Sequence, residues 1–573
     1  MQPDKWPSVW MIFQEKTLHK IWLRSYPPGV PENVDVDEYH SLVELLESSI
    51  ETYGDHLAFS SMGTSLTYNE FHQKINQLAR FFQHHLKLQK GDRIALMLPN
   101  ILQYPISLFA ALKVGLIVVN VNPLYMPEEL LHQLHDAKPK AIVVLKNVCA
   151  KLKTVLPQTS VEQVIVTGVG DSLGLLKGGL INLWMVLSKR QGLSCDIGPT
   201  FSFKQALRIG KNGPWQDVVL QPEDTAFLQY TGGTTGVAKG AVLTHHNIVS
   251  NVMQSVAWVK SLLEPGKEIA IIALPLYHVF SLTVSCFAFL YMGAQGVLIA
   301  NPRDLARFMA CLKTVRPSIF VGINTLFQAL LDEADFHELD FQSYKITIAG
   351  GMATQKQVVE RWKQLTGMTI IEGYGLTEAS PVVSINPVNL NAFNHSIGLP
   401  IPNTQVEIRD EQHHPVAIGN EGELWVRGPQ VMKGYWEKPE ETKKVLDTQG
   451  WLATGDMARM DEAGFLYLVD RKKDMIIVSG FKVYPNEVEE VILHHPEVKE
   501  VGVVGESDPH SGEIVHAFVV RTSDHLTEEA LMQFCAESLT GYKRPKKITF
   551  VESLPKSTVG KILRRELKKL LLR

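Results

Sequence analysis

The sequence predicts an α/β protein with a large N-terminal region of layered α/β subdomains, a small β subdomain, and a mobile, small α+β domain at the C-terminus. In the first part, continuous apolar strands alternate with helices, which is typical of a parallel sheet covered on both faces. From about Ser396, short alternating strands accompany Gly, Pro and polar turn residues, which indicates a β-rich subdomain. The last stretch has its own helices and strands and is long enough to fold separately. We therefore expect two domains, residues 1–470 and 471–573.

The individual elements follow from hydrophobic spacing. After an irregular start, Phe71, Ile75 and Leu78 recur at helical spacing and predict a helix over 68–84. Further strands are predicted at 93–97, 116–121, 141–145, 225–229, 269–273, 296–299, 318–321, 345–348 and 368–372, and helices at 102–113 and 128–135. Beyond them we predict strands at 406–409, 422–427, 465–469, 475–478, 500–504 and 514–520, and helices at 486–494, 527–538 and 562–573. The charge run 470–474 is predicted to be a linker, and the basic side chains of the final helix are interpreted as a solvated face.

Two apolar stretches raise the question of a membrane. Residues 269–300 are nearly uncharged, but Pro275, His278 and Gly293 interrupt them, so we predict strand, turn, helix and strand in the core. Residues 173–187 contain an apolar run around Trp184 with basic residues on both sides. Two interpretations stay open for this run: a helix that covers the core, or a helix that lies in a membrane interface.

The composition of the chain limits which partners and which compartment are expected. A net charge of −4 and an isoelectric point of 6.6 give no electrostatic footprint for nucleic acid. The N-terminus shows no signal peptide, and neither a myristoylation nor a prenylation site is present. The cysteines are dispersed and odd in number, so we expect buried thiols in a reducing compartment and a cytoplasmic protein. They are Cys149, Cys195, Cys286, Cys311 and Cys535.

One polar stretch, Tyr230 to Gly240, stands out after a predicted strand. Its first seven positions hold no aliphatic residue, and it offers backbone N–H groups, hydroxyls and the ammonium of Lys239 to an anion. This pattern predicts a phosphate cradle that joins the strand to a helix beginning near His246. The spacing is not that of a P-loop, because no Gly-Lys-Ser/Thr follows at the required distance. The alternative is a flexible Gly/Thr surface loop.

Other polar groups suited to a nucleotide follow the cradle along the chain. In residues 372–378, the ring of Tyr374 is able to stack on a base, Thr377 to bond a phosphate oxygen and Glu378 to hold Mg²⁺. Asp456 offers a carboxylate to ribose hydroxyls, and Lys561 follows a turn from which it is able to enter a site. The zinc-protease motif H-E-x-x-H is absent. A Rossmann-like run at 168–173 lacks its third glycine and is discarded.

Taken together, these motifs resemble the ordered signature set of the adenylate-forming enzymes, which include acyl-CoA synthetases, luciferases and peptide-synthetase adenylation domains. The resemblance runs from about Ile21 to the C-terminus, and the sequence is most similar to bacterial long-chain fatty-acid CoA ligases. His246 departs from the arginine typical of that group, and residues before about Lys20 lie outside the pattern. The stretches that carry the resemblance are 116–125, 230–240, 275–280, 322–327, 374–378, 454–456, 470–476, 479–487 and 555–565.

The resemblance implies a two-step reaction: a fatty acid and ATP give acyl-AMP and pyrophosphate, and CoA then displaces AMP. The implied catalytic residues are Lys561, Thr377 and Glu378, with Glu378 also holding the Mg²⁺ cofactor. The implied ATP-binding residues are Thr231, Gly232, Gly233, Thr234, Thr235, Gly236, Lys239, Gly350, Gly351, Met352, Tyr374, Gly375, Asp456 and Arg471. The C-terminal domain would rotate between the steps about Lys473, bringing Gly480, Phe481 and Lys482 to the CoA path. The expected acyl pocket contains Tyr277, His278, Phe280 and Gly322.

The expected partners are thus fatty acid, ATP and CoA, without nucleic acid. Peripheral contact with the cytoplasmic face of the inner membrane and a homodimer are left open. Three alternative functions also stay open: a fatty acyl-AMP ligase, an arylate-CoA ligase, and a membrane-associated lipid-binding protein without turnover. The first of these usually carries an insertion that hinders domain rotation, and none lies between Asp470 and Gly480.

Overall fold

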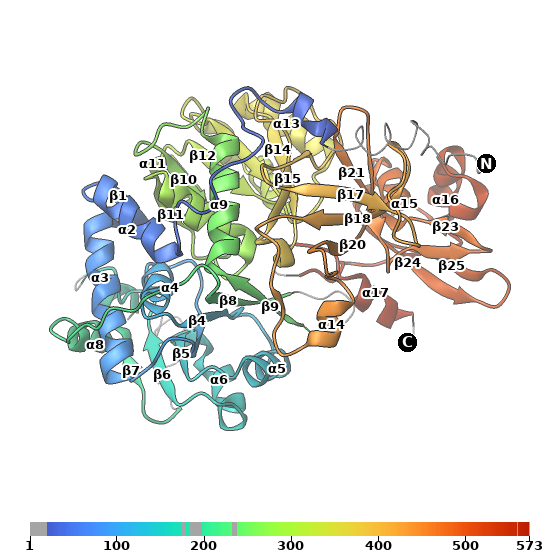
Figure 1. The fold of residues 1–573 in the computed structure, drawn as a ribbon. Helices are drawn as coiled ribbons and strands as arrows, with labels where there is room; N and C mark the ends of the chain where they lie inside the picture. The colour runs from blue at the N-terminus through green and yellow to red at the C-terminus, as the bar shows by residue number, and fades with distance from the viewer. Residues whose placement is uncertain (1–19, 175–177, 183–196, 232–237, 558–559, 572–573) are drawn as a thin grey trace, which may run out of the picture.

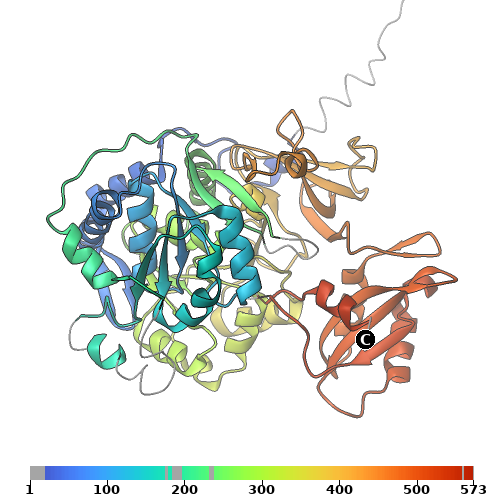
Figure 2. The ribbon, with the colours of Figure 1, turned by 90° about the horizontal axis from the view of Figure 1, so that it is seen from below.

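The computed structural model describes residues 20–174, 178–182, 197–231, 238–557 and 560–571. Among these residues, two large mixed sheets and a four-stranded sheet precede a five-stranded C-terminal sheet. Figure 1 shows helices packed around the two large sheets, with the four-stranded sheet between them and the C-terminal elements. In Figure 2 the C-terminal residues form a lobe of their own, from which a dark red segment reaches back to the rest of the molecule. The predicted α/β class and the smaller C-terminal domain are confirmed.

The first large sheet is built mainly from residues before 245. Its central strands are parallel, whereas its last two pairings, β8 with β9 and β9 with β19, are antiparallel. Its order is β19 (Gly434–Tyr435), β9 (Gly240–Thr244), β8 (Thr225–Tyr230), β4 (Ile117–Asn120), β3 (Arg93–Met97), β5 (Ala141–Leu145), β6 (Gln163–Thr167) and β7 (Phe201–Ser202). The buried, β-branched strands at its centre explain why these strands were predictable from runs of Val and Ile.

The second large sheet has a parallel centre with antiparallel strands at both edges. Its order is β16 (Leu399–Pro400), β15 (Val382–Ile385), β14 (Ile370–Gly375), β13 (Ile346–Ala349), β12 (Ile319–Gly322), β10 (Ile269–Ile272), β11 (Gln295–Leu298), β1 (Leu57–Ser61) and β2 (Thr64–Thr67). The chain thus crosses between the sheets: early strands β1 and β2 complete this sheet, and the late strand β19 completes the other.

The helices of this part cover both sheets. They are α2 (Leu42–Tyr53), α3 (Tyr68–Arg80), α4 (Gln103–Lys113), α5 (Pro127–Ala137), α6 (Cys149–Val155), α8 (Phe203–Gly210), α9 (His245–Val259), α10 (Phe289–Tyr291), α11 (Leu305–Thr314), α12 (Asn324–Leu331), α13 (Lys356–Thr366) and α14 (Pro439–Lys443). Shorter turns of helix are η1 (Ile21–Ser25), η2 (Phe81–His85), η3 (Lys146–Val148), η4 (Leu156–Gln158), η5 (Ser281–Ala288), η6 (Ala334–Glu338) and η7 (Thr377–Ala379). The predicted helix over 68–84 is α3 followed by the π-helical η2.

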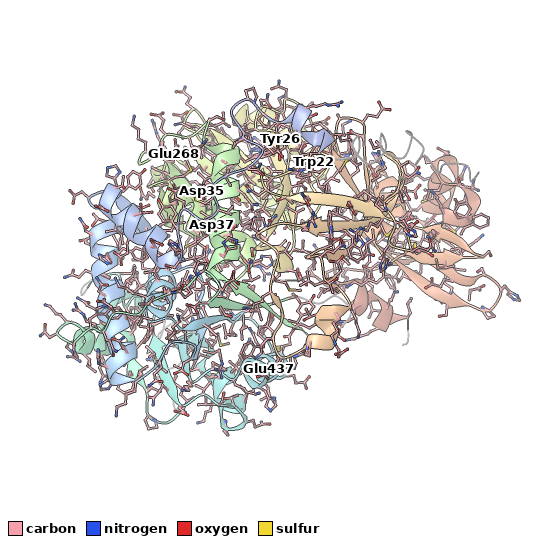
Figure 3. The ribbon with its side chains drawn as sticks, viewed as in Figure 1. Trp22, Tyr26, Asp35, Asp37, Glu268 and Glu437 are labelled. Carbon is pink, nitrogen blue, oxygen red and sulfur yellow. The ribbon has the colours of Figure 1, made fainter. Side chains whose placement is uncertain are left out.

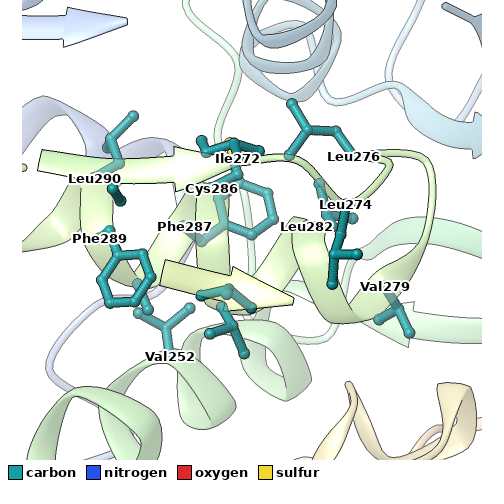
Figure 4. Packing of buried hydrophobic residues seen from close by; sticks show 14 of the residues in the cluster. Val252, Ile272, Leu274, Leu276, Val279, Leu282, Cys286, Phe287, Phe289 and Leu290 are labelled. Atoms are coloured by element: carbon teal, nitrogen blue, oxygen red, sulfur yellow. The ribbon is translucent and has the colours of Figure 1, made fainter. Parts of the chain in front are cut away.

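The uncharged stretch 269–300 lies in the core, as predicted. It forms β10, the π-helix η5, α10 and β11, and Figure 4 shows Phe287, Leu282 and Ile272 from these elements packed together. All eight residues of η5 are buried. Among the described residues, the structure contains no helix of the length and apolarity that crossing a membrane requires. Most of the second apolar stretch, 173–187, lies outside the described residues.

The element after the cradle differs from the prediction. Strand β8 does not lead to a helix but turns back as β9, whose partner residues include Tyr230 opposite Gly240. The run Gly240-Ala241-Val242-Leu243-Thr244 is fully buried, and its β-branched and apolar residues fit a strand between β8 and β19. Helix α9 then begins directly at His245, where the Thr244 side chain accepts a hydrogen bond from the Asn247 N–H. The cradle is therefore the loop of a β-hairpin.

The predicted β subdomain is a four-stranded antiparallel sheet. Its order is β17 (Gln405–Arg409), β18 (Gly422–Arg427), β20 (Leu452–Met460) and β21 (Leu466–Arg471). The first described residues reach this part of the chain: the Tyr26 hydroxyl donates to the Pro400 carbonyl, and Ser25 donates to the Ala463 carbonyl. Trp22 is 3% exposed and lies against Gly464, so a Cβ at that glycine would come within 2.4 Å of the tryptophan backbone. Trp22 and Tyr26 are labelled in Figure 3.

The C-terminal elements have hydrophobic cores of their own. They are β22 (Ile476–Val478), β23 (Phe481–Val483), β24 (Val498–Asp508), β25 (Gly512–Arg521), β26 (Lys547–Phe550), α15 (Pro485–Leu493), α16 (Glu528–Ser538), η8 (Gly541–Lys543) and α17 (Arg564–Leu570). The cores of the preceding part end at Leu466, and those of the C-terminal part begin at Ile476. The domain boundary after residue 470 stays a prediction.

Two further predictions are wrong. The first concerns the final helix, because Arg564 is 13% exposed and ion-paired, whereas Arg565, Lys568 and Lys569 are exposed as expected. Its first turn packs against α15 and β21, where acidic side chains compensate the guanidinium. The second concerns the cysteines: Cys286, Cys311 and Cys535 are free thiols, but Cys149 is disulfide-bonded.

Candidate active site

The described ends of the cradle are held together by the hairpin. Thr231 donates its N–H to the Lys239 carbonyl over 3.0 Å, while Gly232, Gly233, Thr234, Thr235 and Gly236 lie outside the described residues. The Lys239 ammonium pairs with Glu441 of α14 at 2.5 Å and lies 4.9 Å from the centre of the Tyr435 ring. The pairing with Glu441 fixes the position of the Lys239 ammonium in this structure. Because this ammonium is partly exposed and lies at the end of a polar loop, it is also able to bind an anion.

Glu378 lies beside this ammonium site. The Tyr435 hydroxyl donates to the Glu378 carboxylate over 2.7 Å, and Met432 donates its N–H to the Glu378 carbonyl. Tyr435 reaches this position because β19 pairs with β9, the second strand of the cradle hairpin. Thr377 and Glu378 form the short helix η7 directly after β14. The structure therefore brings Lys239, Tyr435 and Glu378 together from three separate parts of the sequence.

A second group of polar residues joins β14 to the β subdomain. The Tyr374 hydroxyl donates to one oxygen of Asp456 over 2.5 Å, and the Arg471 guanidinium pairs with the other oxygen at 2.6 Å. Asp456 and Arg471 face each other across the β20–β21 pairing. Burial raises the pKa of Tyr374 well above its usual value, so the phenol stays a hydrogen-bond donor. Asp456 is 3% exposed, and this carboxylate is fully engaged.

The loop after β13 carries Gly350, Gly351 and Met352. A Cβ at Gly350 would lie 2.9 Å from the Phe280 ring and 3.3 Å from the Gly373 carbonyl, so only glycine allows this close approach. Gly351 has a φ of +79° and an open surrounding space. The loop is pinned further on, where Thr354 donates its N–H to the Glu372 carboxylate over 2.8 Å. Burial raises the pKa of Glu372 to about 7.

The predicted acyl-pocket residues lie on neighbouring segments. Phe280 contacts the Gly350 loop, and Gly322 at the end of β12 faces the Phe327 ring, to which a Cβ would come within 2.7 Å. The Tyr277 carbonyl accepts a hydrogen bond from the Gln229 side chain in β8. Burial lowers the pKa of His278 to about 4, so this imidazole is neutral at physiological pH. Of these residues, Phe280 is the one that the structure places against the Gly350 loop.

Lys561 extends from the C-terminal part into the group around Asp456. The Ser557 N–H donates to the Lys561 carbonyl over 2.7 Å, and this turn presents the lysine. A Cβ at the neighbouring Gly560 would come within 2.8 Å of the Thr325 hydroxyl, so the turn packs closely on the large domain. Burial, and then repulsion by Arg471, lowers the pKa of Lys561 to about 8, against an opposing attraction from Asp456.

The remaining predicted residues divide into two sets. Burial, and then the charge of Arg471 two residues before it, lowers the pKa of Lys473. Gly480, Phe481 and Lys482 lie away from the site, on the β22–β23 hairpin. Phe481 is 56% exposed and stacks on Tyr542 with ring centres 4.8 Å apart, and Lys482 pairs with Glu411 of the β subdomain at 2.8 Å.

Sequence reasoning missed Tyr435, Glu441 and Glu372. Tyr435 and Glu441 reach the predicted site residues because β19 pairs with β9. This pairing joins positions about two hundred residues apart, so the residues near Tyr435 and Glu441 in the sequence do not reveal it. Glu372 directly precedes the predicted Gly373-Tyr374-Gly375 motif. A carboxylate next to a buried apolar strand is a candidate for a raised pKa, and this pattern could have identified it from the sequence.

The capacity of this site for a metal ion depends on a single carboxylate, that of Glu378. Over the parts of the chain that the structure describes, no group of three or more His, Cys, Asp or Glu side chains is placed to hold one. A magnesium ion that arrives with nucleotide phosphates needs only one or two protein carboxylates. Glu378 is such a carboxylate, partly exposed and oriented by Tyr435. The residues present therefore fit a magnesium ion bound chiefly by a substrate.

Comparison with known proteins assigns the family. Residues 46–436 match the family described as AMP-binding enzyme, and residues 487–561 match the AMP-binding enzyme C-terminal domain. The chain belongs to the AMP-binding enzyme family. This AMP-binding enzyme is 49% identical over 551 residues to a long-chain-fatty-acid–CoA ligase of Escherichia coli O157:H7, with 96% of this chain and 98% of the relative covered. Enzymes of the same name are 46% identical in Haemophilus influenzae and 38% identical in Bacillus subtilis, covering 98% and 97% of those relatives and 96% of this chain in each case.

Solved structures of this family share the fold. ATP-bound MatB from Rhodopseudomonas palustris superimposes with a TM-score of 0.79 at 25% identity, covering 92% of the present AMP-binding enzyme and 98% of MatB. The anthranilate CoA ligase AuaEII in complex with anthranoyl-AMP gives a TM-score of 0.82 at 24% identity, with 94% and 99% of the two chains covered. The family matches and the relatives at 38–49% identity confirm the predicted membership of the adenylate-forming enzymes.

Proposed function

We propose that the protein is an AMP-forming long-chain fatty-acid CoA ligase. The main support for this proposal is the 46–49% identity to enzymes of that name over 96% of this chain. The grouping of Lys239, Glu378, Asp456 and Lys561 from distant parts of the sequence supports an ATP-dependent reaction. In the first step, a carboxylate oxygen of the fatty acid attacks the α-phosphorus of ATP and pyrophosphate leaves. In the second, the CoA sulfur attacks the acyl carbon and AMP leaves.

The residues supply position and charge for the first step. In this proposal the cradle from Thr231 to Lys239 holds the β- and γ-phosphates, and Lys239 leaves Glu441 to do so. Adenine lies between Tyr374 and the loop of Gly350, Gly351 and Met352, next to Gly375. Asp456 and Arg471 bind ribose, and Thr377 contacts the α-phosphate. Glu378 would hold a magnesium ion, which when bound would neutralise phosphate charge.

Lys561 has the most demanding proposed role. The attacking carboxylate and the α-phosphate are both anionic, and an ammonium between them offsets their repulsion. The support for this role is the turn that packs Gly560 on Thr325 and directs Lys561 toward Asp456 and Arg471.

The second step needs a different arrangement of the C-terminal domain. Lys561 and its turn occupy the site in the present arrangement, whereas Gly480, Phe481 and Lys482 lie on an exposed hairpin. We propose that the domain, residues 471–573, rotates about Lys473 and brings that hairpin to the CoA path. Tyr277, His278, Phe280 and Gly322 line the acyl pocket, and a peripheral contact with the cytoplasmic face of the membrane would give access to fatty acids.

The proposal is tested by incubating the purified protein with Mg-ATP and oleate, with and without CoA, and identifying the products. AMP, pyrophosphate and oleoyl-CoA formed in quantity only with CoA are the expected result. Accumulation of acyl-AMP despite CoA would instead indicate a fatty acyl-AMP ligase. Conversion of benzoate but not oleate would indicate an arylate ligase, and bound oleate without ATP consumption would indicate a lipid-binding protein.

The role of Lys561 is tested with Lys561→Ala. Acyl-AMP formation should fall by about a thousandfold, since a single group that stabilises transition-state charge contributes about this much. Lys556→Ala is the matched control, because Lys556 lies on the same turn but pairs with Glu500, away from the site, at 2.6 Å. Normal adenylation by Lys561→Ala would contradict the assignment.

A further inference from the structure

Arg564 is held in a cage of acidic side chains at the junction of the two proposed domains. Its guanidinium pairs with Glu489 of α15 at 2.8 Å, with Asp470 at 3.0 Å and with Asp474 at 3.5 Å. It also donates to the Asn486 side chain over 2.5 Å. One cation thus contacts three carboxylates, and its planar fork satisfies several of them at once.

The two ends of this cage belong to different units. Asp470 is the penultimate residue of β21 in the β subdomain, and its side chain is 0% exposed. Its second oxygen accepts the Asn486 N–H over 2.7 Å, in the first turn of α15. Glu489 and Arg564 both belong to the C-terminal elements. The Asp470 carboxylate of the large domain therefore binds both α15, through the Asn486 N–H, and α17, through Arg564.

Whether these Asp470 contacts survive a domain rotation depends on where they lie relative to the proposed hinge at Lys473. Asp470 precedes Lys473 in the chain, whereas Asn486, Glu489 and Arg564 come after it. A rotation about Lys473 carries the Arg564–Glu489 pair along as one body. The same rotation separates Asp470 from Arg564 and from the Asn486 N–H, so these two contacts exist only in the present arrangement.

Removing the Arg564 guanidinium would leave the surrounding carboxylates without a compensating positive charge. Burial raises the pKa of Asp470 and of Glu489, and the guanidinium opposes that effect. Without it, several carboxylates would lie close together in a poorly hydrated place, and partner loss at a buried ion pair is strongly destabilising. Domain separation relieves this repulsion by exposing Asp470 to water. Neutralising Arg564 therefore disfavours the closed arrangement more than it disfavours either domain.

We propose that Arg564 is a positioning residue for the first step: through Asp470 it holds the C-terminal domain in the arrangement in which Lys561 enters the site. Lys561 lies three residues before Arg564, and between them the Leu563 N–H donates to the Pro555 carbonyl over 2.8 Å. The anchor and the catalytic turn are thus one short, internally bonded unit. This inference rests on the proposed function and adds to it the group that selects the adenylating arrangement.

The kinetic test separates the two steps. With Arg564→Gln we expect single-turnover formation of oleoyl-AMP to slow at least tenfold, while transfer of a preformed oleoyl-AMP to CoA is unchanged or faster. Asp470→Asn should shift the two steps in the same directions, and Arg564→Lys should restore part of the first. Arg565→Gln is the control, because Arg565 is exposed and pairs only with the neighbouring Glu566 among the contacts described. Equal slowing of both steps would overturn the proposal.

A second readout does not depend on turnover. Fluorescent labels are introduced through unnatural amino acids at Val219, which is 73% exposed, and at Asp524, whose side chain is 95% exposed. Energy transfer between them should change on Arg564→Gln and remain as in the parent protein on Arg565→Gln. An unchanged signal with Arg564→Gln would overturn the inference. Failure of the parent protein to form acyl-AMP would instead refute the proposed function, so the two failures are distinguishable.

Discussion

The partly buried position of Lys561 predicts an alkaline limit on acyl-AMP formation. Burial, then repulsion by Arg471, lowers its pKa from 10.5 to about 8, in spite of attraction by Asp456. The shift corresponds to about 3 kcal/mol of preference against the ammonium form in the free enzyme. The lysine must nevertheless be charged to bring two anions together. Raising the pH through about 8 should therefore remove the active form.

The size of the effect follows from this pKa. With a pKa of about 8, about nine tenths of the lysine is charged at about pH 7 and about one tenth at about pH 9, so kcat/KM should fall about tenfold. The assay is pyrophosphate release without CoA at subsaturating ATP, from about pH 6.5 to about pH 9.5, because kcat/KM reports the pKa of the free enzyme. The sign is that of a required cation: activity is present below the pKa and lost above it.

Two comparisons make the test decisive. Lys561→Arg, whose guanidinium keeps its charge throughout, should lose the alkaline limb whatever its absolute rate. Transfer of preformed acyl-AMP to CoA should not fall over the same range, because its nucleophile is a thiol, whose thiolate fraction rises with pH. A profile of acyl-AMP formation that stays flat beyond about pH 9, or a limb that persists in Lys561→Arg, would refute the reasoning.

Two further predictions concern groups that the structure adds to the site. Glu372→Gln should raise the thermal midpoint at pH 8 but not at pH 5, because burial raises the pKa of Glu372 from 4.5 to about 7 and only its ionised form is disfavoured. An equal gain at both pH values in thermal melts would count against this. Tyr435→Phe should raise the KM for Mg-ATP about tenfold, since a hydrogen bond to a charged group contributes about 1.5 kcal/mol. Tyr467→Phe, which removes a similar bond to Asp461 in the β subdomain, is the control and should leave that KM unchanged.

The sequence was most informative where structure is decided locally. Strands such as β3, β5 and β10 are short apolar runs between polar segments, and their buried faces leave few alternatives. Helix α3 was equally clear, since its apolar residues recur every three or four positions and Thr67 caps it. In these cases the neighbours along the chain carry most of the information.

The errors arise where distant segments decide. Strand β9, ahead of the predicted helix, was not predicted, because its role as a strand depends on β8 on one side and on β19 on the other. Arg564 reads like one member of a solvated basic face, since nothing nearby in the sequence reveals that Asp470 and Glu489 meet it. Tyr435 and Glu441 were missed for the same reason. The ordered motifs, by contrast, predicted Asp456 and Arg471, which the structure pairs directly.

The crossing of the chain between the two large sheets has a consequence for synthesis on the ribosome. Strands β1 and β2 leave the ribosome early, but β11, the parallel partner of β1, emerges more than two hundred residues later. The cradle hairpin likewise waits for β19 at Gly434–Tyr435. Long-range pairings of this kind fold slowly and leave strand edges open in the meantime. The nascent chain therefore carries an uncovered apolar strand edge through most of translation, and the large domain closes only when nearly all of its sequence has emerged.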